Sequence, residues 1–451
     1  MLVGSLAFVA VVAARHSILS PPSRVAFPGW MAGPLAGLTA SYRPSDEARR
    51  IFLTVLAGGM FVGYVVVIAG SAYLRPRYAI AALVAIELIF FISPPLSLTD
   101  IFNYINYARM EQLHGLNPYT TIAALGPHGD LSYQLSNWHA LLSPYGPLFT
   151  IFTFALVPLG VAASFWVLKL TFLAASLASL WLVWRCAELL GRDPLRATLF
   201  VGLNPLVLIW GLGGVHNDFI TVLFVMLAVY LLLEVRARRG QAAVEPGPAR
   251  EVGAGFLLVA AVAVKASAGL LLPVVLLGAP RRMRLLAGMV VGAVVLGAAS
   301  LYAFGPHLPN LAQQSTLVAL VGLPNVVGYI LGFGGETDTM KFVLDGILVV
   351  AVIAASGWAW RTGKWIEAAG WATLALLLTL SWTLPWYVLW LLPFAALARA
   401  RALRIAAVLV SLYLMLAWVP LMTDLIHSIG FRPSLTLLGQ HRQVQTLTLL
   451  H

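Results

Sequence analysis

Apolar runs, most of them nearly long enough to cross a membrane, divide this chain from end to end. They fall at residues 2–19, 51–73, 80–96, 161–184, 197–212, 220–233, 252–277, 285–304, 342–360, 366–380, 385–397 and 405–420. A transmembrane helix needs ~20 mainly apolar residues. Only 10% of the 451 residues are charged, whereas soluble domains have about 25%. The sequence therefore predicts an all-α polytopic membrane protein, with residues 1–451 forming a single membrane domain.

The basic residues predict which side of the membrane each connection faces, because Lys and Arg favour cytoplasmic loops. Most of them lie in short connections, at Arg75 and Arg77; Arg185, Arg192 and Arg196; Arg236, Arg238, Arg239 and Arg250; Arg281, Arg282 and Arg284; Arg361 and Lys364; and Arg399, Arg401 and Arg404. We place these connections in the cytoplasm. The long polar segment 97–146 contains Arg109 as its only Lys or Arg. We place this outer segment outside.

The number of crossings follows from these two sides. The chain must cross the membrane an odd number of times between the outer segment and the cytoplasmic Arg185. The run 161–184 supplies one crossing, so the short run 147–160 is predicted to be an interfacial helix. The run 252–277 begins and ends at basic connections, so we expect two short helices that meet near Lys265 and Ala266. The total is about 13 transmembrane helices, with residues 305–341 as a second outer loop. One connection placed outside conflicts with the charge rule, because it carries Arg24, Arg43, Arg49 and Arg50.

Composition also excludes several classes of function. The single cysteine, Cys186, rules out a disulfide framework. The net charge of +11 is explained by cytoplasmic loops, so we expect no nucleic-acid partner. No second cluster of His or carboxylates with ligand spacing accompanies His216. We therefore predict no metal and no other cofactor.

Polar and aromatic residues gather at the ends of helices that this arrangement places outside. Polar groups at membrane depth are costly and usually face a cavity or a partner. We take as site candidates Asp100, which closely follows the run 80–96, together with Tyr104, Arg109, Asn117, Tyr119, Tyr145, His216, Asn217, Asp218, Lys265, Trp386 and Tyr387. The cytoplasmic turns carry mainly arginines and small residues, so the site is predicted to face outward.

These residue types suit transfer of a sugar from a lipid phosphate to a hydroxyl. The Asp100 carboxylate can act as a general base. Lys265, with Arg109 or His216 near it, can neutralise the departing phosphate. Aromatic side chains suit the apolar faces of sugars. The expected reaction is a one-step displacement with inversion at the anomeric carbon.

Each candidate also has an ordinary structural explanation. Asp100 could be a solvated helix end, and Arg109 a solvated helix face. Residues 216–218 could be a helix cap, and Lys265 a snorkelling lysine. The aromatic residues near Trp386 could anchor the protein in lipid. A lipid or solute transporter is a competing function, kept open by Lys169 in the middle of a span. The one-sided distribution of polar groups and the lack of an internal repeat argue against it.

The motifs, taken together, resemble one known family. They are DIFNYINYARMEQLHGLNPYT, SPYGPLF, NPLVLIWGLGGVHND, AVAVKASAGLLLPVVLL and LPWYVLWLLPFAAL. In this order they are similar to the polyprenyl-phosphate-mannose-dependent α-1,6-mannosyltransferases of lipoglycan assembly, over roughly residues 51–397. The NPY, SPYGP and HND elements of the family match residues 117–119, 143–147 and 216–218.

The resemblance implies a C-type membrane glycosyltransferase fold and a catalytic aspartate at the position of Asp100. It further implies transfer of mannose from a polyprenyl-phosphate donor to a lipid-linked or cell-envelope glycan acceptor. The protein would lie in the inner or plasma membrane, among membrane lipids, with its site on the outer face. Another lipid-phosphate sugar, such as arabinose or glucose, stays open as the donor.

Overall fold

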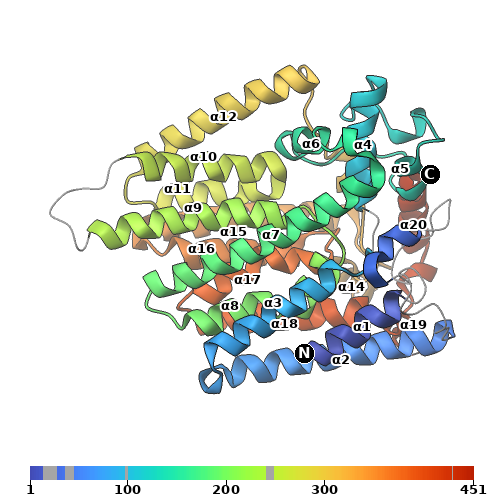
Figure 1. Cartoon of the computed structure of the whole chain (residues 1–451), viewed down its shortest axis with the longest axis horizontal. Helices are drawn as coiled ribbons and strands as arrows, with labels where there is room; N and C mark the ends of the chain where they lie inside the picture. The colour runs from blue at the N-terminus through green and yellow to red at the C-terminus, as the bar shows by residue number, and fades with distance from the viewer. Residues whose placement is uncertain (14–27, 36–44, 97–99, 240–247, 429, 451) are drawn as a thin grey trace.

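The computed structural model describes residues 1–13, 28–35, 45–96, 100–239, 248–428 and 430–450. Every regular element in these ranges is a helix, which confirms the all-α prediction. The longer helices lie side by side along the long axis of the molecule (Figure 1).

The α-helices follow one another in the order α1 (Leu2–Ala13), α2 (Asp46–Ala69), α3 (Pro76–Phe91), α4 (Asp100–His114), α5 (Leu131–Leu135), α6 (Pro147–Phe154), α7 (Gly160–Leu189), α8 (Pro194–Gly202), α9 (Asp218–Arg239), α10 (Ala249–Val264), α11 (Leu271–Gly278), α12 (Arg282–Phe304), α13 (Ala312–Ser315), α14 (Leu323–Ile330), α15 (Asp338–Thr362), α16 (Trp365–Thr379), α17 (Val388–Leu397), α18 (Arg401–Trp418), α19 (Met422–Ser428) and α20 (Leu437–Leu450). Short 3-10 turns and one π-helical turn join some of them: η1 (Gly29–Leu35), η2 (Ser71–Tyr73), η3 (Ala123–Leu125), η4 (Val157–Leu159), η5 (Val207–Leu212, the π-helix), η6 (Ala266–Leu270), η7 (Pro385–Tyr387) and η8 (Pro433–Leu435).

Five segments of the described chain are long and apolar enough to cross a membrane. They are α2, the stretch from α6 through α7, α12, α15 and α18. Shorter apolar helices accompany them, among them α1, α16 and the pairs η6–α11 and η7–α17. This composition indicates an integral membrane protein, with fewer full-length spans than the roughly 13 that the sequence predicts.

The arginine-rich connections gather at one end of the bundle. The Arg282 guanidinium at the start of α12 lies 5.6 Å from the ring centroid of Trp360, near the end of α15. The amide of Arg399 donates a hydrogen bond of 3.0 Å to Glu367 at the start of α16. In Figure 1 the start of α12 and the ends of α7 and α9 lie at the left, whereas α4, α5 and α6 lie at the right. The turns with most arginines are therefore far from the outer segment.

The predicted helix break at Lys265 is confirmed. α10 ends at Val264, Lys265 adopts an extended conformation (φ −151°, ψ 120°), and η6 and α11 follow. α12 packs closely on α10, since a Cβ on Gly255 would lie 2.1 Å from the carbonyl oxygen of Leu285. The end of α11, which precedes α12, thus returns to the end of the bundle where α10 began.

Residues 147–160 form the short helix α6 and the turn η4, ahead of the long helix α7. The place of this segment at a membrane interface stays a prediction. Arg24 and Arg43, which conflicted with the charge rule, lie outside the described residues. Arg49 pairs with Asp46 at 2.5 Å.

Candidate functional site

A cavity of about 370 Å³ opens at the end of the bundle that carries α4. Asp100 and Lys265 both line it, although 165 residues separate them in the sequence. Seven aromatic side chains contribute to its wall: Tyr104, Trp138, Tyr145, Trp382, Trp386, Tyr387 and Trp390. A mainly apolar cavity with a few converging polar groups is the usual form of a small-molecule site.

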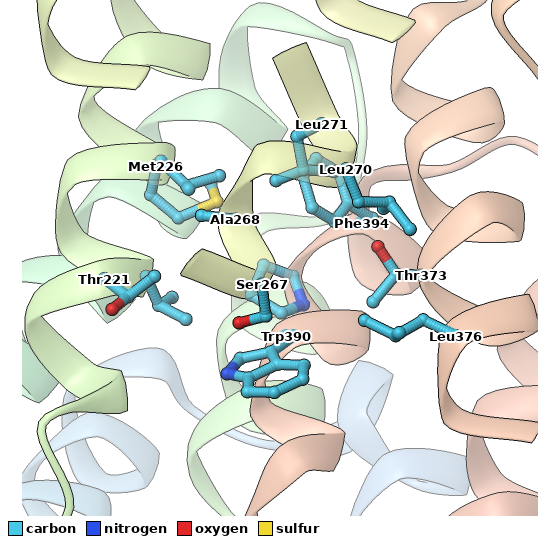
Figure 2. Close-up of a pocket in the computed structure, with 13 residues that line it drawn as sticks. Thr221, Met226, Ser267, Ala268, Leu270, Leu271, Thr373, Leu376, Trp390 and Phe394 are labelled. Atoms are coloured by element: carbon cyan, nitrogen blue, oxygen red, sulfur yellow. The ribbon is translucent and has the colours of Figure 1, made fainter. Parts of the chain in front are cut away.

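A smaller recess of about 30 Å³ adjoins this cavity and shares Ser267 and Trp390 with it (Figure 2). Its other lining residues are mainly apolar and include Met226, Leu271 and Phe394. The recess therefore adds apolar volume beside Lys265 and brings no further charge to the site.

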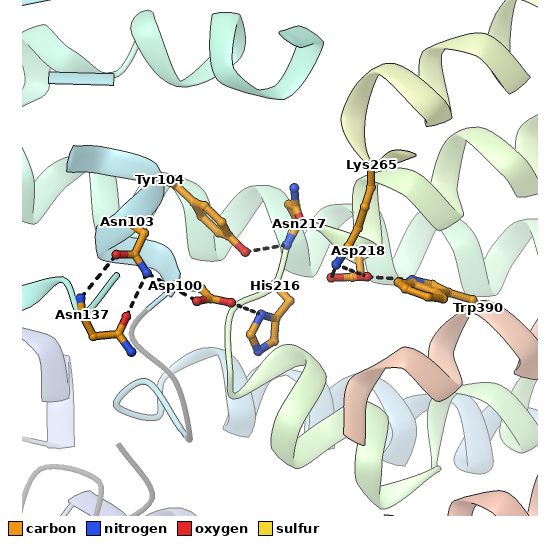
Figure 3. A network of polar contacts seen from close by, with 9 residues as sticks. All are labelled: Asp100, Asn103, Tyr104, Asn137, His216, Asn217, Asp218, Lys265 and Trp390. Carbon is orange, nitrogen blue, oxygen red and sulfur yellow. Dashed lines mark hydrogen bonds and ion pairs between the residues drawn. The ribbon is translucent and has the colours of Figure 1, made fainter. Parts of the chain in front are cut away.

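The Asp100 carboxylate is held from two sides (Figure 3). Its Oδ2 atom lies 3.3 Å from Nδ1 of His216, and the Nδ2 amide of Asn103 donates a hydrogen bond of 3.4 Å to Oδ1. Asn103 is fixed in turn by Asn137, whose side-chain oxygen accepts at 2.9 Å from the same Nδ2. Asp100 begins α4, where the helix dipole stabilises a negative charge. Its side chain keeps 12% of its surface exposed, so the carboxylate is oriented and still reachable from the cavity.

The turn before His216 has an unusual backbone. It follows the π-helix η5, a form often found at functional sites. A side chain does not fit at Gly213 or at Gly214. A Cβ on Gly214, for example, would lie 2.1 Å from the carbonyl oxygen of Trp210. Val215 has a positive φ of 61°, which is rare for a β-branched residue and is kept only where the surrounding structure enforces it. The turn thus delivers residues 216–218 together to the site.

The His216 ring stacks on Trp386, with centroids 3.6 Å apart and planes within 10°. Trp386 belongs to η7, which comes much later in the chain than His216. The two segments are thus joined by this ring contact. The stack holds the plane of His216 so that Nδ1 faces Asp100. Its Nε2 atom is buried and has no hydrogen-bond partner among the described residues.

Lys265 and Asp218 form an ion pair beside the cavity. The ammonium nitrogen lies 2.8 and 2.9 Å from the two carboxylate oxygens, and the Trp390 indole N–H donates at 2.6 Å to Oδ1 (Figure 3). The ammonium also lies over the rings of Tyr387 and Trp390, 4.8 and 5.2 Å from their centroids, in cation–π geometry. Asp218 is 1% exposed and Lys265 is 19% exposed. The cation therefore faces the cavity while its partner stays behind it.

The loop before α6 is anchored directly beside Lys265. The amide of Gly146 donates a hydrogen bond of 3.0 Å to the carbonyl of Val264. A Cβ on Gly146 would lie 2.2 Å from the carbonyl oxygen of Ala263, so only glycine permits this approach. Tyr145 is thereby placed in the cavity wall, with its ring perpendicular to that of Tyr104 at 4.6 Å. Burial raises the pKa of both phenols, so they stay neutral.

Three of the predicted site residues in the outer segment lie outside the cavity lining and bond to protein groups. Arg109 pairs with Asp130 at 2.8 Å. Burial alone would raise the pKa of Asp130, but hydrogen bonds from Arg109 and Ser132 outweigh it and lower the pKa. The Asn117 amide donates at 2.8 Å to the carbonyl of Phe304, and the Tyr119 hydroxyl at 2.9 Å to that of Tyr145. These three organise the outer segment, and their roles toward a substrate stay predictions.

Asn217 is fully buried, and within the part of the chain that the structure describes neither polar atom of its side chain has a hydrogen-bond partner. Its backbone amide donates to the hydroxyl of Tyr104 at 3.3 Å. His216, Asn217 and Asp218 thus form a layer behind the residues that line the cavity. Their roles in the reaction stay predictions.

The sequence prediction missed several residues of the site. Asn103 lies one helical turn after Asp100, so its spacing was a usable signal. Trp390 follows Tyr387 by the same spacing in the WYVLW motif. Trp138, Asn137 and Trp382 carried no such signal, because only the fold brings them to the cavity.

Two family models match the chain. The model described as "Alpha-(1->6)-mannopyranosyltransferase, N-terminal domain" matches residues 2–281, and the model described as "MptB C-terminal domain" matches residues 315–438. No solved structure matches it.

Curated relatives agree with these matches. The chain is 28% identical over 365 residues to alpha-(1->6)-mannopyranosyltransferase A of Mycobacterium tuberculosis, covering 73% of this chain and 67% of that protein. It is 30% identical over 189 residues to the protein of that name from Corynebacterium glutamicum, covering 40% of this chain and 34% of that protein. Because the first family model covers more than half of the sequence, the chain belongs to the alpha-(1->6)-mannopyranosyltransferase family of glycosyltransferases, as its motifs predicted.

Proposed function

We propose that this protein transfers mannose from a polyprenyl-phosphate donor to a hydroxyl of a glycan acceptor, forming an α-1,6 linkage with inversion. The observation that carries this proposal is the shared cavity, in which one reachable carboxylate, Asp100, and one cation, Lys265, meet within aromatic walls. The printed names of the relatives supply the sugar and the linkage. An α product formed with inversion requires a donor of β configuration.

The proposed step is a single displacement. Asp100 takes the proton of the acceptor 6-hydroxyl as its oxygen attacks the anomeric carbon. The bond from that carbon to the phosphate oxygen breaks, and its electron pair leaves with the phosphate. The Lys265 ammonium stabilises the charge that develops there. His216 and Asn103 hold Asp100 in place, and the tyrosine and tryptophan rings cover the apolar faces of the sugar.

The assignment of the base to Asp100 follows from the bonding of the two carboxylates. Asp218 accepts hydrogen bonds from Lys265 and Trp390 and is almost fully buried. Asp100 lines the cavity. A base must reach the proton that it removes, and Asp100 meets this requirement.

We further propose that the chain has a C-type glycosyltransferase fold with about 13 spans, in the inner or plasma membrane. The five candidate spans and the shorter apolar helices support a polytopic chain. The separation of the arginine-rich turns from the cavity supports an outward-facing site. In this arrangement residues 97–146 and 305–341 are outer loops, and residues 147–160 lie at the interface.

The test is Asp100→Asn in the full-length protein, reconstituted in lipid and assayed with polyprenyl-phosphate-mannose. Loss of the general base is expected to lower the turnover by about 10³-fold, with unchanged thermal stability. The glucose and arabinose counterparts of the donor, offered to the wild type, are expected to react much more slowly. Normal turnover by Asp100→Asn would contradict the mechanism, and preference for another sugar would contradict the donor.

A further inference from the structure

A second cavity, of about 730 Å³, lies next to the proposed active site and has no part in the mechanism above. Residues 318–321, the end of α18, the start of η8 and one face of α20 line it. Trp382 lines both cavities. Leu311, Gln314, Ser315 and Leu317 line the first, and residues 318–321, which follow directly, line the second. One stretch of chain and one indole ring therefore separate the two cavities.

The walls of the second cavity combine aromatic rings with neutral polar groups. Trp382 and Trp418 supply the rings, and the buried Nε1 atom of Trp418 has no hydrogen-bond partner in the described ranges. Further polar side chains come from His427, Ser434, Gln443 and Thr446. Rings suit the C–H faces of sugars, and hydroxyl and amide groups suit their hydroxyls. The volume lies within the range of known small-molecule sites, about 300–1,000 Å³.

The charge of this wall argues against an anionic ligand. Arg442 lines the cavity, but its charge is paired with Asp338, to which its guanidinium donates at 2.7 Å. It also donates at 3.2 Å to Gln445, and only its Nε has no partner among the described residues. A phosphate would need a cation free to bind it. The lining therefore favours a neutral saccharide.

Other contacts join the second cavity to the outer segment. The amide of Ala140 donates at 3.0 Å to the carbonyl of Leu449, near the end of α20. The rings of Trp138 and Trp382 lie edge to face at 6.2 Å. The wall thus continues from α20, past Trp382, to the cavity that holds Asp100.

We propose that the second cavity binds the non-reacting sugars of the acceptor, a neutral oligosaccharide that extends past Trp382 to place its terminal 6-hydroxyl at Asp100. This proposal rests on the proposed function of the first cavity, because that reaction supplies the acceptor. It adds a binding site that lies largely in the carboxyl-terminal region, after the last of the motifs that the sequence analysis identified.

The test compares a short and a long acceptor, a synthetic α-1,6-linked mannose disaccharide and the corresponding hexasaccharide. Trp418→Ala and Gln443→Ala are each expected to raise the KM for the hexasaccharide about tenfold, the loss of one good contact. Their kcat, and their KM for the disaccharide, should stay unchanged. Gln440→Ala is the matched control, since it removes the same side chain from an exposed site on α20 outside the cavity lining.

Equal effects on both acceptors, or no effect on either, would overturn the proposal. A rise in KM with Gln440→Ala would do the same. A separate measurement keeps the reaction and the subsite distinguishable: binding of the hexasaccharide, followed by calorimetry without donor, to the otherwise intact protein. Binding that weakens about tenfold in Trp418→Ala supports the subsite even where transfer from polyprenyl-phosphate-mannose fails. Failure of transfer with normal, Trp418-dependent binding contradicts only the proposed reaction.

Discussion

Two ion pairs in this protein look alike and lie in different surroundings. Lys265 pairs with Asp218, and Arg109 pairs with Asp130, each with a shortest distance of 2.8 Å. The two cations are almost equally exposed, at 19% and 20%. Lys265 lines the main cavity, whereas Arg109 lies in the outer segment away from the cavity lining.

The difference teaches that charge and exposure alone do not distinguish the cation that we propose for the donor phosphate from one that pairs elsewhere. The sequence offered both Lys265 and Arg109 for that role. Asp218 is more deeply buried than Asp130. Its additional partner is Trp390, which lines the cavity, whereas the additional partner of Asp130 is Ser132, which does not. The Lys265 pair therefore holds a cation at the cavity, whereas the Arg109 pair joins two parts of the outer segment.

The largest effect is expected from Lys265→Met, which removes the cation from the cavity. Loss of one preorganised charge typically lowers kcat by about 10²- to 10³-fold. The matched change, Arg109→Met, should leave kcat within about threefold of wild type, since that pair lies outside the cavity lining. Steady-state transfer from polyprenyl-phosphate-mannose measures both.

Because Lys265→Met leaves the buried Asp218 carboxylate unpaired, folding needs its own control. The double variant Lys265→Met with Asp218→Asn removes both charges and should recover thermal stability without recovering activity. Similar decreases in kcat for Lys265→Met and Arg109→Met would contradict the different roles assigned to the two pairs.

Asp218→Asn should have the next largest effect. It keeps the shape of the side chain but releases the Lys265 ammonium from its fixed position, and we expect kcat to fall about 10- to 100-fold. The KM for acceptor should change little, because Asp218 does not line the cavity. A change confined to acceptor KM would show that Asp218 acts on the acceptor rather than through Lys265.

Trp390→Phe sharpens the same point with a smaller change. The variant loses the indole N–H that donates to Asp218 but keeps an aromatic ring beside Lys265. We expect a three- to tenfold decrease in kcat, roughly the loss of one hydrogen bond to a charged group. If Trp390→Phe were as harmful as Lys265→Met, the indole itself would have to contact substrate.

The smallest effect on activity, and a clear effect on stability, is expected at Arg109. The pKa of Asp130 is lowered in the folded protein, so its ion pair stabilises the fold above the unfolded pKa of about 3.9. That contribution is lost as the pH falls through the lower, folded pKa. The free energy of unfolding of the wild type should therefore exceed that of Arg109→Met by about 1 kcal/mol near pH 7. Near pH 2 the two values should be almost equal. Thermal unfolding at the two pH values measures the difference, and an equal gap at both would assign it to packing.

The sequence revealed those parts of the site that lie at the ends of apolar runs. The break at Lys265 followed from counting crossings, and Asp100 and the residues around His216 stood out as polar groups at helix ends. Asp130 did not stand out as the partner of Arg109, because no local pattern links two residues 21 positions apart.

Other features depended on contacts that no local pattern encodes. The second cavity combines residues from 318 to 447, and its far wall lies beyond the last recognisable motif. Lys169, unexplained by the sequence, proves to donate to the carbonyl of Ser93 and to lie 5.5 and 5.4 Å from the ring centroids of Phe165 and Trp166. A backbone oxygen and two aromatic rings thus surround this buried ammonium group.

The contact between Gly146 and α10 has a consequence for the order of events during turnover. Its amide bonds to Val264, the residue directly before Lys265. The chain on one side carries Tyr145 in the cavity wall, and the chain on the other carries the cation. A substrate that displaced either one would disturb this hydrogen bond, so we expect binding of one substrate to affect binding of the other.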